Sequence, residues 1–172
     1  MNTLIQTHVE TNWRAARSAA MPVVHSEFSF QPRTLEQAVQ ATVDAIEDAA
    51  LKPLATDAAQ PLAQARAVLA LLARCYAQQI YRSADAAALA ARDPDFPWFW
   101  WEALPDAAAL RRFRAENRDA LQRCLVAALR FQAEQKIFAG VLTRVNGPQL
   151  AEEAGRRIIM AAFEDNMERE RE

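Results

Sequence analysis

Apolar side chains recur at helical spacing over most of the chain, three or four residues apart along single stripes. One stripe comprises Leu35, Ala38, Val39, Val43 and Ile46, and a longer one runs from Leu62 to Ile80. These stripes predict helices over residues 34–51, 61–82, 84–92 and 149–168. A further long helix should start at Asp106 and extend as far as residue 145, either straight or bent near Gly140. Because no β-rich run interrupts the pattern, we predict an all-α fold with a compact helical domain, a long C-terminal helix and a final helical appendage.

Residues at the predicted helix starts are suited to capping free backbone amides. Thr34 is followed three residues later by Gln37, which is the spacing of a reciprocal capping box. Pro61 suits the first turn of the longest apolar stripe, and Ser83 can cap the short helix after it. Asp106 follows a proline and is a favourable N-cap, since its carboxylate can accept from the first-turn amides. Local chemistry and apolar periodicity therefore agree on the same helices.

The chain divides into three segments on this basis. Residues 1–33 are expected to form an N-terminal arm, partly helical and partly extended, and residues 34–136 the main helical domain. Residues 137–172 form a helical extension, in which Ile137, Val141 and Val145 make an apolar stripe. We expect this stripe and the final helix to serve formation of a homodimer.

Composition narrows the possible functions. The 172 residues hold only three glycines and no glycine-rich phosphate loop, and the two histidines have no cysteine at metal-ligand spacing. No cofactor or metal is therefore expected. Cys75 and Cys124 lie in apolar helical contexts, which favours reduced thiols in a cytoplasmic protein. No apolar run approaches the ~20 residues that a membrane-spanning helix needs. The aromatic run Trp98, Phe99, Trp100 and Trp101 is expected to pack mainly into the core.

The net charge of −2 hides one basic segment. Residues 105–136 carry seven basic and four acidic side chains. In the helix that starts at Asp106, Leu110 and Phe113 share one face, which leaves Arg111, Arg112 and Arg114 around the other. A capped helix with arginines in its first turns is suited to reading DNA, because phosphate binding depends on local potential. The alternative is a solvated surface in which these arginines pair with neighbouring carboxylates.

The middle of the chain resembles a known family. The run C-Y-A-Q-Q-I-Y-R-S over residues 75–83 is similar to a helix end in the InsH-like N-terminal domain of DDE-type insertion-sequence transposases. The run A-A-R-D-P-D-F-P-W over 90–98 resembles the segment that follows in that domain. Pro105 and Asp106, with Leu110 and R-F-R at 112–114, match the signature that closes it. The similarity covers roughly residues 62–125.

This resemblance implies a helix-turn-helix-like domain that recognises the terminal repeats of a mobile element. The candidate DNA contacts are Arg111, Arg112, Arg114, Arg118, Arg82, Ser83 and Gln78. The sequence also departs from the family, since Asp85 stands where the family has a cation and the basic run after R-F-R is diluted. We therefore expect weaker phosphate binding than the family would suggest.

The nuclease half of such a transposase is not expected in this chain. A DDE nuclease needs a sheet that holds three carboxylates around two metal ions, and no β-rich run follows Arg130. The acidic pairs Glu152/Glu153 and Glu164/Asp165 are interpreted as a solvated helix face. The leading hypothesis is a non-catalytic DNA-binding protein that acts as a regulator or beside a separate nuclease. The alternative is a protein–protein interaction adaptor that has lost DNA affinity.

Overall fold

The computed structural model describes residues 34–54, 60–93 and 104–171, all of which lie in one unit that spans Arg33–Glu172. The predicted N-terminal arm and the aromatic run at 98–101 lie outside the described residues. The helices, in chain order, are α1 (Leu35–Asp44), the single 3₁₀ turn η2 (Asp48–Ala50), α2 (Pro61–Ala77), α3 (Ser83–Arg92), α4 (Ala107–Glu116), α5 (Arg118–Phe138) and α6 (Gly147–Arg169). The fold is all-α, as the apolar periodicity predicted.

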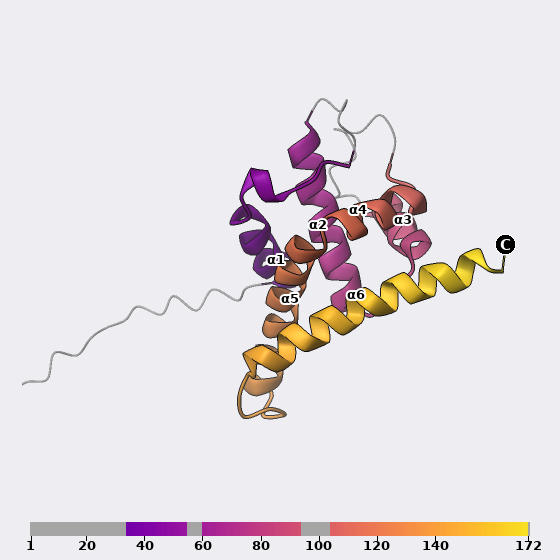
Figure 1. Cartoon of the computed structure of the whole chain (residues 1–172). Helices are drawn as coiled ribbons and strands as arrows, with labels where there is room; N and C mark the ends of the chain where they lie inside the picture. Colours follow the sequence, from indigo (N-terminus) through magenta and orange to yellow (C-terminus); the bar gives the residue numbers. More distant parts are fainter. Residues whose placement is uncertain (1–33, 55–59, 94–103, 172) are drawn as a thin grey trace, which may run out of the picture. The chain divides into compact units, whose positions relative to one another are not determined.

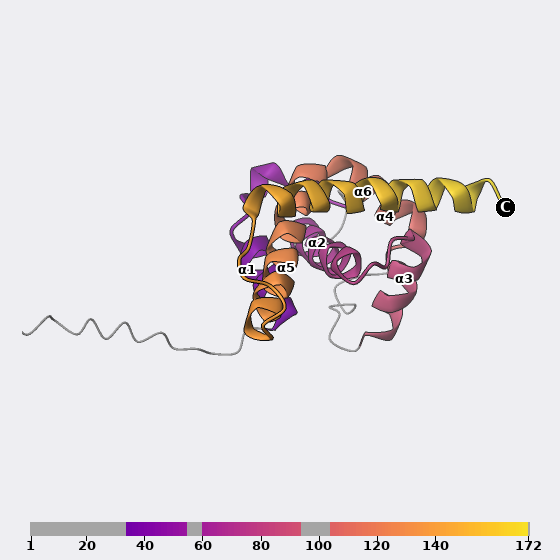
Figure 2. The same cartoon turned by 90° about the horizontal axis from the view of Figure 1, so that it is seen from below.

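Helix α2 is the central element of this unit. Ten of its 17 residues are buried, including Leu69, Leu72 and Tyr76, which matches the nearly apolar stripe in its sequence. Helices α1 and α5 pack against it and against each other, and α3 lies on the opposite side (Figure 1; Figure 2). Burial of side chains of this size stabilises the fold by about 1.5–3 kcal/mol each before entropy is counted. The core therefore forms around α2.

Helix α2 ends at Ala77, five residues before the predicted boundary. Gln79 has a φ of 64°, in the left-handed region that disfavours continuation of a helix. The Ile80 amide then donates to the Cys75 carbonyl at 2.9 Å, which closes the last turn. Arg157 of α6 donates to the carbonyls of Tyr76 and Ala77 at 2.9 and 3.0 Å. The cation satisfies helix-end acceptors and lies at the negative end of the helix dipole.

The predicted long helix after Asp106 is divided at Asn117, and this prediction was wrong. Asp106 does cap α4, since its carboxylate accepts from the Ala109 amide at 2.7 Å. Eleven residues after Asp106, Asn117 leaves helical geometry with φ −115° and ψ 30°. Its side-chain oxygen accepts from the Lys52 amide at 2.7 Å, and its amide donates to the Lys52 carbonyl at 3.0 Å. This pairing with a distant segment sets the break between α4 and α5.

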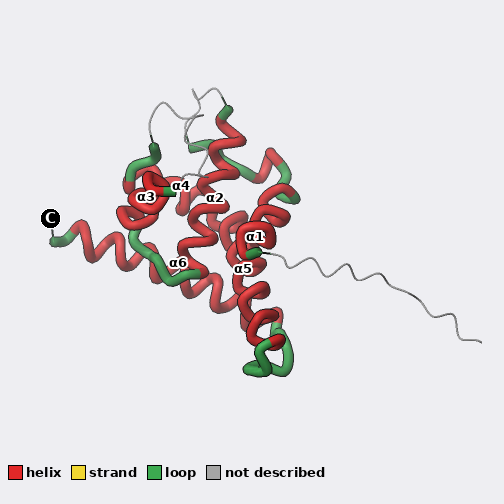
Figure 3. The backbone as a smooth tube through the Cα atoms, turned by 180° about the vertical axis from the view of Figure 1, so that it is seen from behind, coloured by secondary structure: helices red, strands yellow, loops and turns green. Residues whose placement is uncertain are grey.

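The second end of that helix also differs from the prediction. Helix α5 ends at Phe138, and Gly140 has a φ of 71°, where the Val141 amide donates to the Lys136 carbonyl at 2.8 Å. Gly140 therefore terminates α5 rather than bending it. Asn146, which was expected to end the helix, instead caps α6 by accepting from the Gln149 amide. Figure 3 shows the loop between α5 and α6.

Helix α6 packs along α5 and reaches the end of α2. Its buried side chains are Ala154, Ile158, Ala161 and Asp165, which recur at three- and four-residue spacing on one face. The extension expected at 137–172 thus supplies part of the core of the unit that starts at Arg33. The helix-turn-helix-like arrangement stays a prediction, because the segment that joins α3 to α4 includes residues 94–103.

Candidate functional site

A buried ion pair links α6 to α4, the helix that was predicted to carry the basic surface. The Arg114 guanidinium donates to the Asp165 carboxylate at 2.7 Å, with side chains 8% and 1% exposed. The same carboxylate accepts from the amide and the hydroxyl of Ser83, both at 2.7 Å. Charge-assisted hydrogen bonds of this kind are roughly twice as strong as neutral ones. Arg114, Asp165 and Ser83 therefore bind the ends of three helices together.

The Tyr76 hydroxyl completes this network. It accepts from Arg114 at 3.2 Å, and burial is the main cause that raises the Tyr76 pKa to about 12, although Arg114 acts in the opposite direction. Burial also works against the charge on Arg114, but its interactions with Tyr76 and Asp165 outweigh this effect and raise its pKa. The guanidinium is thus held charged in the interior by two oxygen acceptors.

This network contradicts three predictions from the sequence. Arg114 and Ser83 were expected to contact DNA, and Asp165 was expected to lie on a solvated helix face. Arg114 and Ser83 are 6% and 1% exposed, and both donate hydrogen bonds to Asp165 in the interior, so neither faces a phosphate. Asp165, interpreted from the sequence as part of a solvated acidic pair, is fully buried. A signal for this was present in the sequence. Arg114 follows Leu110 by four residues, and Asp165 follows Ala161 by four, so each charge continues an apolar stripe.

Arg82 and Gln78 lie at the connection between α2 and α3. Arg82 is exposed and forms ion pairs with Asp85 at 2.8 Å and with Glu168 of α6 at 3.6 Å. Its hydrogen bond with Asp85 raises its pKa. Gln78 is exposed at the end of α2. Asp85 therefore compensates the charge of the neighbouring Arg82.

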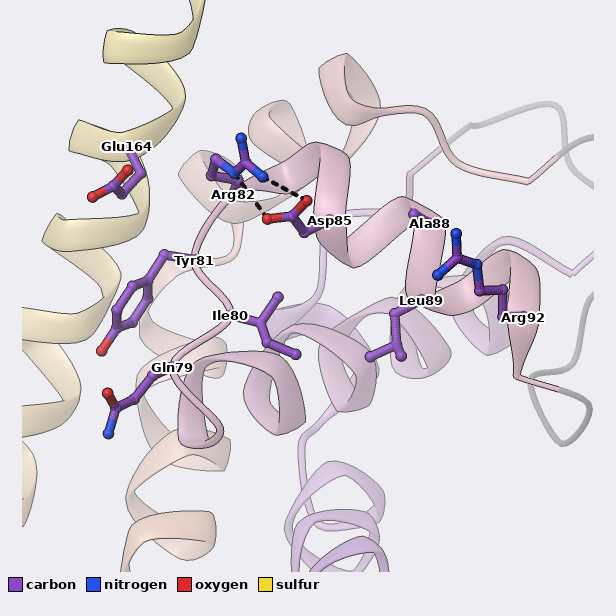
Figure 4. A pocket seen from close by; sticks show the side chains of 9 residues that line it. All are labelled: Gln79, Ile80, Tyr81, Arg82, Asp85, Ala88, Leu89, Arg92 and Glu164. Carbon is purple, nitrogen blue, oxygen red and sulfur yellow. Dashed lines mark hydrogen bonds and ion pairs between the residues drawn. The ribbon is translucent and has the colours of Figure 1, made fainter.

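A shallow groove of about 600 Å³ opens beside this ion pair. Figure 4 shows it between the connector at Ile80, the exposed side of α3 at Leu89, and Glu164 of α6. Arg82 and Asp85 occupy one end, and Arg92 lies at the other. Its lining mixes apolar side chains with two arginines and two carboxylates, so it has no cluster of like charges. Among the described residues, no group of three or more histidine, cysteine, aspartate or glutamate side chains is arranged to hold a metal.

The remaining three arginines of the predicted DNA surface are accessible. Arg112 is exposed and donates to the Leu54 carbonyl at 3.0 Å, Arg118 is exposed at the start of α5, and Arg111 is half-exposed. None of the three has a carboxylate partner within the described part of the chain. The carboxylates of Glu116 and Asp119 are exposed on the same stretch, which dilutes the local positive potential.

Three large apolar side chains are exposed at the middle of α6, among exposed polar residues. Ile159, Met160 and Phe163 are 58%, 41% and 55% exposed, and their spacing places them on one face. Clustered exposure of large apolar side chains marks an interaction surface, whereas single residues do not. We call Ile159, Met160 and Phe163 the α6 outer face. Elsewhere, Val141 is 70% exposed in the loop after α5, while its expected stripe partners Ile137 and Val145 are half-buried.

Neither cysteine supports nucleophilic chemistry. Both thiols are buried and unpaired, and burial raises the pKa of Cys75 to about 11 and that of Cys124 to about 12. No helix among the described residues has the length and apolar character needed to cross a membrane. No protein-family model, curated protein or solved structure matches the chain. The transposase resemblance therefore stays a prediction from the sequence.

Proposed function

We propose that this chain is a non-catalytic helical module that binds another protein through the α6 outer face. The observation that carries the proposal is the exposure of Ile159, Met160 and Phe163 together on one side of a helix whose other side is anchored in the core. Aromatic and methionine side chains are enriched in protein interfaces relative to the rest of the surface.

The exposed apolar surface supplies part of the free energy that a specific contact needs. Full burial of one such side chain is worth about 1.5–3 kcal/mol, so three roughly half-exposed side chains contribute on the order of 3 kcal/mol. A partner that also buries the flanking polar side chains would add complementarity and exclude water. Anchoring of α6 by Ile158, Ala161 and Asp165 holds the face in a fixed geometry, which lowers the entropy lost on binding.

The interior position of Arg114 supports a protein-binding role over the DNA-binding hypothesis. The R-F-R signature supplied the most specific residues for DNA binding, and its last arginine is used to hold α6. With Ser83 buried and Arg82 paired to Asp85, three of the seven candidate contacts are engaged within the protein. Each phosphate contact that is lost lowers the salt-dependent part of the affinity.

DNA binding remains a second candidate because Arg111, Arg112 and Arg118 have no carboxylate partner in the described residues. Three phosphate contacts would give a logarithmic salt slope of about −2.7 on duplex DNA. An electrophoretic shift titration at two salt concentrations should compare the wild type with the triple alanine variant at these positions. Arg144→Ala, which removes an exposed arginine from the loop before α6, is the matched control. Binding that is lost only in the triple variant would favour this second candidate.

The proposed function is tested by purifying the wild type and Phe163→Glu at low salt. We expect the wild type to elute with a stoichiometric protein partner, which a second copy of the chain can supply. The 260/280 nm absorbance ratio should be that of protein alone. Phe163→Glu should lose the partner while keeping its helical circular dichroism, since the side chain is exposed. Equal partner retention by both proteins, or nucleic acid in the wild-type preparation with no protein partner, would contradict the proposal.

A further inference from the structure

The residues along the outward side of α6 are arranged symmetrically about Phe163. Arg156 lies seven residues before it, and Glu170, the C-cap residue that follows α6 with helical backbone angles (φ −75°, ψ −13°), lies seven residues after it, which is about two helical turns in each direction. Ile159 and Met167 lie four residues on either side. All five therefore share one helical face, with a cation at one end, a carboxylate at the other and apolar side chains between them. Such a pattern is complementary to its own reverse.

We propose that the partner on the α6 outer face is a second copy of this chain, with the two α6 helices antiparallel and the two-fold axis beside Phe163. This inference rests on the proposed function and specifies its partner. In a two-fold contact, residue i meets residue j of the second copy, and j meets i. Phe163 then meets its own counterpart, and Ile159 meets Met167 of the second copy. Arg156 lies opposite Glu170 of the second copy at both ends.

The end charges select the antiparallel arrangement. A parallel pair would also bring the two Phe163 rings together, but it would place Arg156 over Arg156 and Glu170 over Glu170. Like charges at facing positions are unfavourable, whereas the reversed pairing creates two complementary contacts. Both side chains are exposed, with Arg156 64% exposed, so they are accessible to a second chain.

The apolar centre supplies most of the association energy. Arg156 already contacts Glu152 and Glu153 in its own chain, at 3.0 and 3.1 Å, so its charge is shared before any partner arrives. Surface ion pairs contribute little to affinity in water. The charges therefore set the direction of pairing, and contact between Phe163 and its counterpart, flanked by Ile159 and Met160, sets the strength.

Light scattering coupled to size-exclusion chromatography tests the proposal over a concentration series. We expect the wild-type mass to rise from 19.2 kDa towards twice that value. Phe163→Glu places two carboxylates at the axis and should weaken association at least tenfold. Val141→Glu, at an exposed position in the stripe predicted from the sequence, should leave the association unchanged. A wild type that is monomeric throughout, or a dimer dissolved by Val141→Glu and not by Phe163→Glu, would overturn the proposal.

Charge exchange and crosslinking test the direction of pairing. Glu170→Arg alone should weaken association severalfold, and Arg156→Glu combined with Glu170→Arg should restore it. A mixture of the Ile159→Cys and Met167→Cys variants should form a mixed covalent dimer with a short bismaleimide, because the antiparallel pair brings these two positions together, whereas a parallel pair would link like positions. Cys75 and Cys124 are buried and do not compete. Absence of both the rescue and the crosslink would exclude this antiparallel pairing.

The outcomes separate this inference from the proposed function. If the wild type is monomeric but retains a different stoichiometric protein that Phe163→Glu loses, the function stands and self-association is wrong. If neither a second copy nor another protein binds, both are wrong.

Discussion

Replacement of Asp165 by asparagine should be one of the most destabilising isosteric changes in the protein. Asparagine keeps the shape of the side chain and can still accept from the Ser83 amide. It cannot accept fully from Arg114, whose side chain is 8% exposed and whose other acceptor among the described residues is the Tyr76 hydroxyl. The substitution therefore leaves the charge of Arg114 in the interior without the carboxylate that balances it.

The expected cost follows from that geometry. Breaking a buried ion pair by removal of one partner costs about 3–5 kcal/mol. Because asparagine preserves part of the hydrogen bonding, we expect roughly 3 kcal/mol, the lower end of that range. For a chain of this size that corresponds to a decrease in Tm of about 6–12 °C. Urea unfolding followed by circular dichroism at 222 nm measures the free-energy change, and Glu164→Gln at the neighbouring half-exposed position should change it by less than ~0.5 kcal/mol.

A double-mutant cycle separates the ion pair from general damage to the core. Arg114→Met removes the charge and keeps an apolar stem, so its combination with Asp165→Asn leaves no unpaired cation. We expect a coupling energy of about 2 kcal/mol between the two positions, so that the double variant is more stable than the sum predicts. Additive losses, or a loss below ~1 kcal/mol for Asp165→Asn alone, would refute the assignment of Arg114 as an interior anchor.

Two further changes test the core and the helix break. The free energy of unfolding should fall as pH rises above about 9. In the unfolded chain the thiols of Cys75 and Cys124 release their protons near pH 9.0, whereas in the folded protein their pKa values of about 11 and 12 keep them protonated. Tyr76, whose pKa is also raised, adds to the loss of stability above pH 10. Each group contributes up to ~1.4 kcal/mol per pH unit, and Cys124→Ala should flatten the curve measured by urea titration. Asn117→Ala should cost about 1–3 kcal/mol, since it leaves the Lys52 amide and carbonyl without their partner. A flat pH profile from 9 to 11, or an Asn117→Ala cost below ~0.5 kcal/mol, would contradict these assignments.

The sequence predicted the helices well where local chemistry determines them. The Thr34–Gln37 capping box is present as expected, with both reciprocal hydrogen bonds, and Asp106 caps α4. The apolar stripe of α2 correctly marked the most buried helix. These features depend on side chains within a few residues of one another, so a single sequence contains the information needed to find them.

The breaks between helices were harder to predict from the sequence, because contacts with distant residues determine them. The division at Asn117 depends on Lys52, which lies 65 residues earlier. The early end of α2 at Ala77 is coupled to Arg157, 80 residues later. The apolar periodicity continues through both places, and tertiary hydrogen bonds override it.

The burial of charged side chains at the candidate site was hard to predict for the same reason. Arg111, Arg112 and Arg118 were correctly expected at accessible positions. Whether Arg114 is buried depended on which face of α4 packs against α6. A buried cation and a buried carboxylate on two separate helices become predictable only when the helices are known to pack together. Their positions on apolar stripes were the available signal. Conversely, Phe163 was not singled out, since its exposure follows from the anchoring of α6 by Asp165 on the other face.

Sedimentation velocity of the protein mixed with a fluorescent DNA duplex at low salt tests the central claim most directly. We predict that the protein sediments as a concentration-dependent species, reduced to the monomer by Phe163→Glu, while the duplex sediments as it does alone. Cosedimentation of the duplex with a monomeric protein, lost on replacement of Arg111, Arg112 and Arg118 by alanine, would contradict the account and favour DNA binding.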